Sequence, residues 1–286
     1  MIGSRHSNLK KILPKAGFYG GLAFFIIFAA GPFYIMLITM FKRSHDLFNP
    51  NNNPFFFTEP PTMAHLKLLF DQTLFTTFLL NTLLVGLAVV AITVILAVPA
   101  AFSLARMAGR WGDSMGIGIF LTYLVPPTLL FIPLSRIVSI LNLQNSLWSL
   151  ILVYPTFTVP FCTWLLMSFF KSIPKDIEEQ ALIDGCSRIG AFFRVLLPLA
   201  GPGIISVIVF AFTLVANDYI YALAFIQNSA MKTIGIGLTT ELVRGDVFYW
   251  GSLMAGALLA SVPVALVYTV FLDRIISGLG MGGIGK

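Results

Sequence analysis

The sequence predicts an all-α protein that crosses a lipid bilayer six times. Of its 286 residues, 57% are hydrophobic and only 10% are charged, a composition that a water-soluble globular protein of this size would not have. Apolar stretches long enough to cross a bilayer recur along the chain, and most Lys and Arg residues lie between or beyond them. The net charge of +6 is therefore better explained by membrane orientation than by nucleic-acid binding.

The first expected span covers residues 17–41 and follows a basic N-terminal tail at residues 1–16. An uninterrupted apolar stretch of about 25 residues is too long for the hydrophobic region of a cleaved signal peptide, so we expect a retained membrane helix. Residues 42–76 are polar, aromatic and rich in Pro and Asn. This composition is typical of a loop outside the cytoplasm with side chains at the membrane interface.

The core of the chain, residues 77–273, contains five further predicted spans. They are expected at residues 77–105, 114–139, 147–169, 203–226 and 250–273, and a tail at residues 274–286 follows them. Six spans place both termini on one side of the membrane, and twelve of the eighteen Lys and Arg residues then lie on that side. Because basic residues are enriched on the cytoplasmic side, we expect both termini in the cytoplasm.

The segment 174–202 separates two of these spans and holds seven charged side chains, so it is expected on the cytoplasmic membrane surface. It predicts two short helices. Pro174 suits the first position of a helix, and Gly185 suits a left-handed C-terminal cap. Acidic side chains in the first turn complement the helix dipole. These are Asp176, Glu178 and Glu179.

The second short helix is expected to begin after Ser187, whose hydroxyl can cap it. Apolar residues then follow at helical spacing and predict one apolar stripe. They are Ile189, Phe192, Phe193, Leu196 and Leu197. Pro198 and Pro202 are expected to end this helix before the next span.

Part of this segment forms a characteristic pattern. Its residues are Glu179-Gln180-Ala181, Asp184-Gly185, Pro198 and Pro202. The pattern resembles the EAA loop of the permease subunits of bacterial ABC importers, and most of all the MalG-like branch that transports carbohydrates. Gln180 and Cys186 stand where this family generally has alanine. The resemblance covers roughly residues 77–286 and implies the type I ABC importer permease fold in a bacterial inner membrane.

The resemblance also implies that the chain is a non-catalytic subunit that works with partners. A sister permease would complete the pore, and a solute-binding protein, periplasmic or lipid-anchored, would deliver a mono- or disaccharide or a sugar derivative. A dimer of ABC ATPases would bind ATP and Mg²⁺, and no cofactor is expected in this chain. The first loop helix would dock into a cleft of the ATPase. Glu179 and Asp184 would make polar contacts, and Ala181 and Gly185 would keep the surface narrow enough for close approach.

The helix itself supports a docking role. Its apolar residues, which include Ile177, Leu182 and Ile183, lie on a segment too short to be a stable helix alone in water. Such a helix is typical of one that binds in a groove of a partner.

A second group of candidate residues lies in the fifth predicted span. It consists of Asn217, Asp218, Tyr219 and Tyr221. A carboxylate inside the membrane costs on the order of 2.5–3.5 kcal/mol, so Asp218 should face a cavity or a hydrogen-bond partner. One interpretation is a structural hydrogen bond. The other is a substrate path, because polar and aromatic groups suit a sugar, and sugar permeases of the family have a similar motif here, although usually after Trp rather than Ala216.

Two other classes of protein remain as alternatives at this point. An ion-coupled secondary transporter or channel would use Asp218 as its ion site, but this reading leaves residues 174–202 unexplained. An intramembrane enzyme would need a catalytic set within the spans, and the sequence shows no convincing one. The three His residues are scattered over the tail and first loop without metal-ligand spacing, so no metal site is expected.

Overall fold

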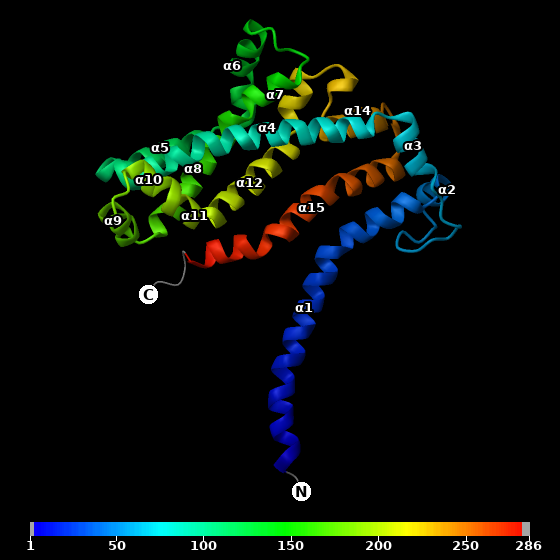
Figure 1. Cartoon of the computed structure of the whole chain (residues 1–286). Helices are drawn as coiled ribbons and strands as arrows, with labels where there is room; N and C mark the ends of the chain where they lie inside the picture. The colour runs from blue at the N-terminus through cyan, green and yellow to red at the C-terminus, as the bar shows by residue number, and fades with distance from the viewer. Residues whose placement is uncertain (1–2, 282–286) are drawn as a thin grey trace. The chain divides into compact units, whose positions relative to one another are not determined.

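The protein is helical throughout most of its length (Figure 1). The computed structural model describes the backbone of residues 3–281 and the side chains of residues 17–271 other than 127, 267 and 270. Two compact units can be distinguished, Met1–Thr73 with Leu242–Leu259 and Leu74–Glu241 with Ala260–Lys286. Residues 282–286 of the predicted C-terminal tail lie outside the described residues. The prediction of an all-α fold is confirmed.

The first unit is built on a long N-terminal helix. Its elements are α1 (Gly3–Phe41), α2 (Ser44–Phe48), α3 (Ala64–Gln72), the strands β1 (Val243–Arg244) and β2 (Val247–Phe248), and the first part of α15 (Trp250–Met281). The strands form an antiparallel hairpin whose turn contains Gly245 at a φ of 59°. Because α1 begins at Gly3, the backbone of the predicted tail is already helical and continues into the first span.

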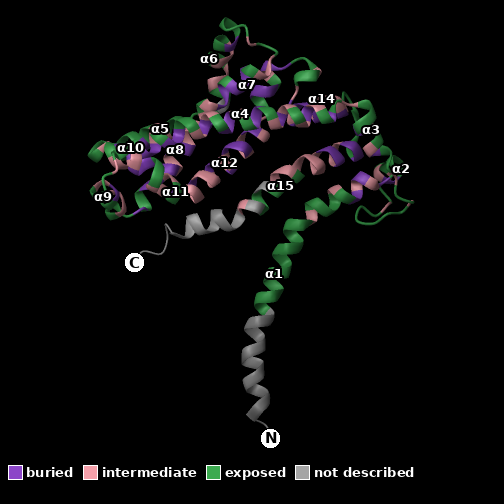
Figure 2. Cartoon of the chain, viewed as in Figure 1, coloured by how far each residue is buried: buried purple, intermediate pink, exposed green. Residues whose placement is uncertain are grey.

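The apolar part of α1 is almost entirely exposed within this chain (Figure 2). Its side chains include Phe24, Ile27 and Phe28, which are more than half exposed. Such a surface is stable where lipid or another apolar surface covers it, because it would be costly in water. This exposure is consistent with the predicted membrane span at residues 17–41.

The segment that follows α1 folds around a buried ion pair. Lys42 and Asp46 are 3% and 2% exposed, and Lys42 Nζ lies 3.7 Å from Asp46 Oδ2. The Asn52 amide and the Thr58 backbone N–H donate to the Asp46 carboxylate, at 2.8 and 3.2 Å. Lys42 Nζ donates to the Asn53 carbonyl at 2.6 Å. Both buried charges therefore have hydrogen-bond partners, which a buried ion pair requires.

The second unit contains most of the remaining helices. They are α4 (Phe75–Phe102), the π-helical turn η1 (Ser103–Met107), η2 (Gly109–Trp111), α5 (Gly112–Tyr123), α6 (Pro127–Ile140), α7 (Leu147–Val153), α8 (Pro155–Ser172), α9 (Lys175–Ile183), α10 (Arg188–Ala191), the π-helical turn η3 (Phe192–Leu196), α11 (Leu197–Leu199), α12 (Gly201–Ala216), α13 (Ile220–Phe225), η4 (Ser229–Met231) and α14 (Ile234–Leu242).

Helix α4 is the centre of this unit, because it packs along both α8 and α12, while α5 packs on α8 (Figure 1). The buried hydroxyls of Thr93 on α4 and Thr158 on α8 lie 2.7 Å apart and link the two helices. Gly86 allows α4 to approach α12, since a Cβ atom at this position would lie 2.5 Å from the ring of Phe212. Small residues at such crossings are typical of membrane helices.

Buried apolar side chains form two clusters in this unit. The first lies beside the 174–202 segment and includes Phe102, Leu166, Phe170, Phe192 and Leu196. The second lies around the break between α12 and α13 and includes Val89, Tyr154, Val215, Tyr221 and Phe225. Each of the two candidate sites therefore rests on its own buried cluster.

Two of the six predicted spans are not continuous helices. Among the described residues, three helices are long and apolar enough to cross a membrane alone, namely Gly17–Phe41, Phe75–Met107 and Leu147–Ser172. Trp250–Leu266 is a shorter apolar helix. The third predicted span bends by 86° between α5 and α6, where Pro126 and Pro127 cannot continue a helix.

The fifth predicted span, residues 203–226, is also interrupted. Helix α12 ends at Ala216 and α13 begins at Ile220, so the expectation of one continuous helix here is wrong. At its other end, α12 meets the preceding loop helices at a bend of 71°. A proline near the start of α12 is one reason for this bend, because it lacks a backbone N–H.

Replacing Gly86 by Ala is expected to destabilise the protein. The added Cβ would overlap the Phe212 ring and force α4 and α12 apart, at a cost of about 1–3 kcal/mol. Gly118→Ala is the matched control, because a Cβ at Gly118 meets no atom within 4 Å. Thermal unfolding in detergent should show a lower midpoint only for the Gly86 variant. Equal midpoints for the two variants would contradict the close approach of α4 to α12.

The Asp46 network predicts a pH dependence. Burial raises the pKa of the Asp46 carboxyl, but the Thr58 and Asn52 donors and the Lys42 ammonium outweigh burial and lower this pKa below its ordinary value. Because the folded pKa is below the unfolded value of about 3.9, the ionised carboxylate stabilises the fold above that pH. This contribution is lost as the pH falls through the folded pKa.

Asp46→Asn should therefore increase proteolysis of residues 49–62 at neutral pH, measured by limited digestion followed by mass spectrometry. The difference from the wild-type protein should shrink as the pH falls below the unfolded value of about 3.9 and through the lower folded pKa, where the wild-type carboxyl also becomes protonated. A difference that stays constant over this range would show that the charge of Asp46 does not stabilise the segment.

Candidate functional site

The first loop helix, α9, has well-defined ends. Pro174 precedes it with extended ψ (137°), so this residue is the N-cap rather than the first helical residue that the sequence predicted. At the other end Gly185 has a φ of 90°, which confirms the predicted left-handed cap. The Gly185 N–H donates to the Leu182 carbonyl and the Cys186 N–H to the Ala181 carbonyl, at 3.1 and 3.0 Å. This pair of bonds is a Schellman motif, which fixes the turn after α9.

The second loop helix begins as predicted but does not form the predicted stripe. The Ser187 hydroxyl accepts from the Gly190 N–H at 3.1 Å, which confirms the N-cap. Phe192 is buried, whereas Ile189 and Phe193 are 71% and 59% exposed. Ile189 stands before the π-helical turn η3, in the first turn of the helix. The wider turn changes the 3.6-residue register only for the residues that follow Phe192.

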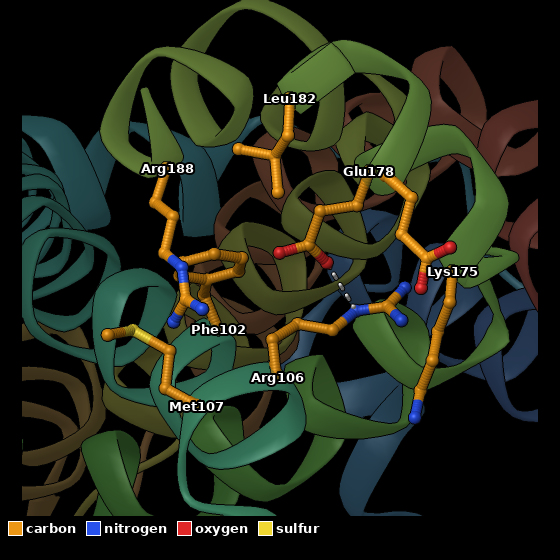
Figure 3. Close-up of a pocket in the computed structure, with 8 residues that line it drawn as sticks. Phe102, Arg106, Met107, Lys175, Glu178, Leu182 and Arg188 are labelled. Atoms are coloured by element: carbon orange, nitrogen blue, oxygen red, sulfur yellow. Dashed lines mark ion pairs between the residues drawn. The ribbon is translucent and has the colours of Figure 1, made fainter. Parts of the chain in front are cut away.

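Arg106 fixes α9 to the rest of the unit, and the sequence analysis did not single it out. Its side chain is 4% exposed, and Nη2 donates to the carbonyls of Phe170 and Ile173 at 2.7 and 2.5 Å. Its Nε lies 3.6 Å from Glu178 Oε2 on α9. Figure 3 shows the two side chains pointing toward each other. In the sequence, Arg106 is a basic residue just after a predicted span. Such a residue gives information about membrane orientation but none about a contact with α9.

A pocket of about 200 Å³ opens between α9 and the end of α4 (Figure 3). Its lining contains both acidic and basic side chains and the aromatic ring of Phe102. The lining residues are Phe102, Arg106, Met107, Lys175, Glu178, Glu179, Leu182 and Arg188. The rings of Phe102 and Phe192 lie 4.6 Å apart beneath it. Among the side chains that the structure describes, no group of three His, Cys, Asp or Glu residues is arranged to hold a metal ion.

The four residues predicted to contact a partner do not share one environment. Glu179, Asp184 and Gly185 are exposed around the end of α9. Ala181 is only 7% exposed, so it faces into the chain and cannot narrow an outer surface. Its small side chain instead belongs to the packing beneath α9. The most exposed apolar residue of the helix is Ile183, at 84%.

Asp218 lies in the break between α12 and α13, not inside a continuous span. Its Oδ2 accepts from the hydroxyl of Tyr154, which is fully buried, at 2.8 Å and from the Ala222 N–H at 3.1 Å. The carboxylate therefore binds an N–H of the first turn of α13 and holds the break against the junction of α7 and α8. Of the two interpretations offered by the sequence, the geometry supports the structural hydrogen bond.

The neighbours of Asp218 divide into buried and exposed side chains. Tyr221 is 1% exposed and stacks on Phe157 with ring centroids 6.0 Å apart, so it does not line a path in this chain. Tyr219 is 41% exposed. Asn217 is also exposed, and its amide donates to the Thr213 carbonyl at 2.9 Å. Only Asn217 and Tyr219 keep the accessibility that the predicted path requires.

Comparison with known proteins identifies the fold and family. Residues 97–280 match the profile of the family described as the binding-protein-dependent transport system inner membrane component. The chain is 37% identical to the sulfoquinovosyl glycerol transport system permease protein SmoH of Agrobacterium fabrum over 229 residues, which cover 80% of each chain. It is 32% identical to the inner membrane ABC transporter permease protein YcjP of Escherichia coli, over 96% of this chain and 98% of that one.

A crystal structure shares the fold. It is that of a bacterial ABC transporter involved in the import of the acidic polysaccharide alginate, with a TM-score of 0.75 and 19% identity over 96% of this chain and 99% of that chain. The type I ABC importer permease fold predicted from the EAA-like loop is thus confirmed. The findings do not support the alternative of an ion-coupled transporter or channel. The chain belongs to the family of inner-membrane components of binding-protein-dependent transport systems, the non-catalytic permease subunits of ABC importers.

Proposed function

We propose that this chain forms one half of the transmembrane pore of an ATP-driven importer of a carbohydrate, and that α9 docks into a cleft of a separate ATPase subunit. The observation that carries the docking proposal is a short surface helix, α9. The ion pair of Glu178 with Arg106 fixes it to the chain, and apolar side chains are exposed around its C-terminal end. ATP and Mg²⁺ would bind to the ATPase, whose closure would move α9.

The exposed apolar residues are Ile183 and Ile189, which are 84% and 71% exposed on either side of Gly185. They belong to the charged segment 174–202, where lipid does not account for apolar exposure as it does on α1. Each would remove apolar area from water in a groove, which stabilises binding by about 25 cal/mol per Å². The exposed carboxylates of Glu179 and Asp184 would make polar contacts around them.

The family and the charge distribution support the remaining partners and the orientation. A binding-protein-dependent system includes a solute-binding protein, periplasmic or lipid-anchored, and the permease family implies a sister permease that completes the pore. The segment 174–202 and both termini would lie in the cytoplasm, because twelve of the eighteen basic residues are then on that side.

The substrate class is inferred from the relatives and from the chemistry of the helix break. One relative is named for sulfoquinovosyl glycerol transport, and the structural neighbour takes part in alginate import, so both handle carbohydrates. In this chain, Asn217 and Tyr219 offer an amide and an aromatic ring at an accessible helix break. These groups suit the hydroxyls and the apolar faces of a sugar.

Ile183→Glu is expected to weaken binding of the ATPase. Burying an Ile side chain stabilises a contact by about 1.5–3 kcal/mol, so its replacement by a charged residue should raise the Kd about 10- to 100-fold. Co-purification and titration of the cognate ATPase with the permease complex would measure the effect. Gly185 is a less informative position, because its φ of 90° means that any substitution also strains the turn.

Ile183→Leu is the matched control and should bind the ATPase like the wild-type protein, because it keeps the apolar side chain. Both variants should insert in equal amounts, since Ile183 makes little contact within the chain. Undiminished ATPase binding by a normally inserted Ile183→Glu protein would refute the docking role of this end of α9.

Tyr154→Phe is expected to destabilise the protein because it removes the buried donor to Asp218. A hydrogen bond to a charged group contributes about 1.5–3 kcal/mol. In an Asp218→Ala background the same substitution should have little further effect, and thermal unfolding of the four proteins in detergent tests this non-additivity. Fully additive losses of stability, together with a changed sugar affinity in the Asp218 variant, would contradict the structural role and support a role of Asp218 in the substrate path.

A further inference from the structure

Arg106 links three parts of the second unit: the turn η1 on which it stands, the end of α8 and helix α9. It stands on η1, at the end of the long helix that α4 begins, and it reaches the C-terminal end of α8 and the first half of α9. With its side chain 4% exposed, the guanidinium has left water almost completely. A charge in this position needs compensation from the protein.

The contacts on the α8 side are hydrogen bonds. The carbonyls of Phe170 and Ile173 lie at the end of α8, where the last carbonyls of a helix have no partner within it. They also form the negative end of the helix dipole, which favours a cation. The guanidinium is therefore fixed to the core of the unit at this end.

The contact on the α9 side is of a different kind. Arg106 Nε is buried and makes no hydrogen bond, and Glu178 Oε2 lies 3.6 Å away, within ion-pair distance. Glu178 itself is largely covered, with 18% of its side chain exposed. The attraction between these charges is weakly screened because little water surrounds them. Helix α9 is thus held to the core by charge at its first half, while its far end is exposed.

We propose that Arg106 is a positioning residue for energy coupling: through its ion pair with Glu178, a displacement of α9 is transmitted to α8 and the end of α4. This inference rests on the proposed docking of α9 to an ATPase. A force that the ATPase applies at Ile183 would move the nine-residue helix α9. The core helices would move with α9 only if a contact connects α9 to them. Apolar packing at Ala181 resists compression, whereas the ion pair also resists separation.

Hydrogen–deuterium exchange of the assembled complex tests the proposal without the sugar. The permease pair with its ATPase would be measured with and without ATP and orthovanadate. In the wild-type complex, the nucleotide should change exchange in α9, in α8 and at the end of α4. In Glu178→Gln and Arg106→Gln complexes, α9 should still respond, while the response of the core should fall by about fivefold or more, the lower range of coupling between sites.

Three further measurements separate positioning from a purely structural role. Glu178→Gln leaves the bonds from Arg106 to α8 in place, so it should lower the thermal midpoint less than Arg106→Gln does, while the core response falls in both complexes. Arg106→Lys should restore part of that response because it keeps the charge. Arg110→Gln is the matched control, since Arg110 is an exposed cation of the same connection that lies over the ring of Trp111, and its complex should respond fully.

A core response of wild-type size in both Arg106→Gln and Glu178→Gln complexes would overturn the proposal while leaving α9 docking intact. A wild-type complex in which the nucleotide changes nothing in α9 would instead overturn the proposed function. The two failures are therefore distinguishable in the same experiment.

Discussion

The structure depends on one constraint, which is that a backbone polar group inside a bilayer must find its partner within the protein. Where a helix of this chain stops early, a side chain takes over the hydrogen bonds that the helix would have made. Asp218 accepts an N–H of α13 where α12 has ended, and Tyr154 holds that carboxylate in place. Arg106 donates to carbonyls where α8 ends. Asp218 and Arg106 are therefore both placed where helices end.

This constraint links the fold to its proposed mechanism. Residues that repair a helix end also connect that end to a neighbouring element, because the repairing side chain comes from elsewhere in the chain. Asp218 joins the start of α13 to the junction of α7 and α8 through Tyr154, and Arg106 joins η1 to α8 and, by its charge, to α9. A motion applied to the surface helix would then have a polar route to the end of α8.

Sequence reasoning predicted the helical class, the end of the first loop helix and the start of the second, because hydropathy, Gly185 and Ser187 report local properties. It could not predict which side of α9 faces inward, and so it placed Ala181 on the outer surface. It also missed the π-helical turns, whose i→i+5 bonds leave no clear mark in a pattern of apolar residues. The pairing of Arg106 with Glu178 joins residues 72 positions apart by way of tertiary packing. No periodicity within a single helix reports such a contact.

Exposure of apolar side chains has a different meaning in different parts of this protein. On α1, exposed Phe and Ile residues agree with lipid contact, so they point to no particular partner. In the segment 174–202 the surrounding side chains are charged. Exposure of Ile183 and Ile189 there indicates a contact with a partner protein rather than with lipid. The surroundings of a buried charge also differ between two sites. At Asp46, four polar groups surround the carboxylate. At Arg106, the Nε atom makes no hydrogen bond and has only the Glu178 carboxylate of α9 beside it. The first arrangement fixes a loop, and the second leaves a contact that force on α9 can alter.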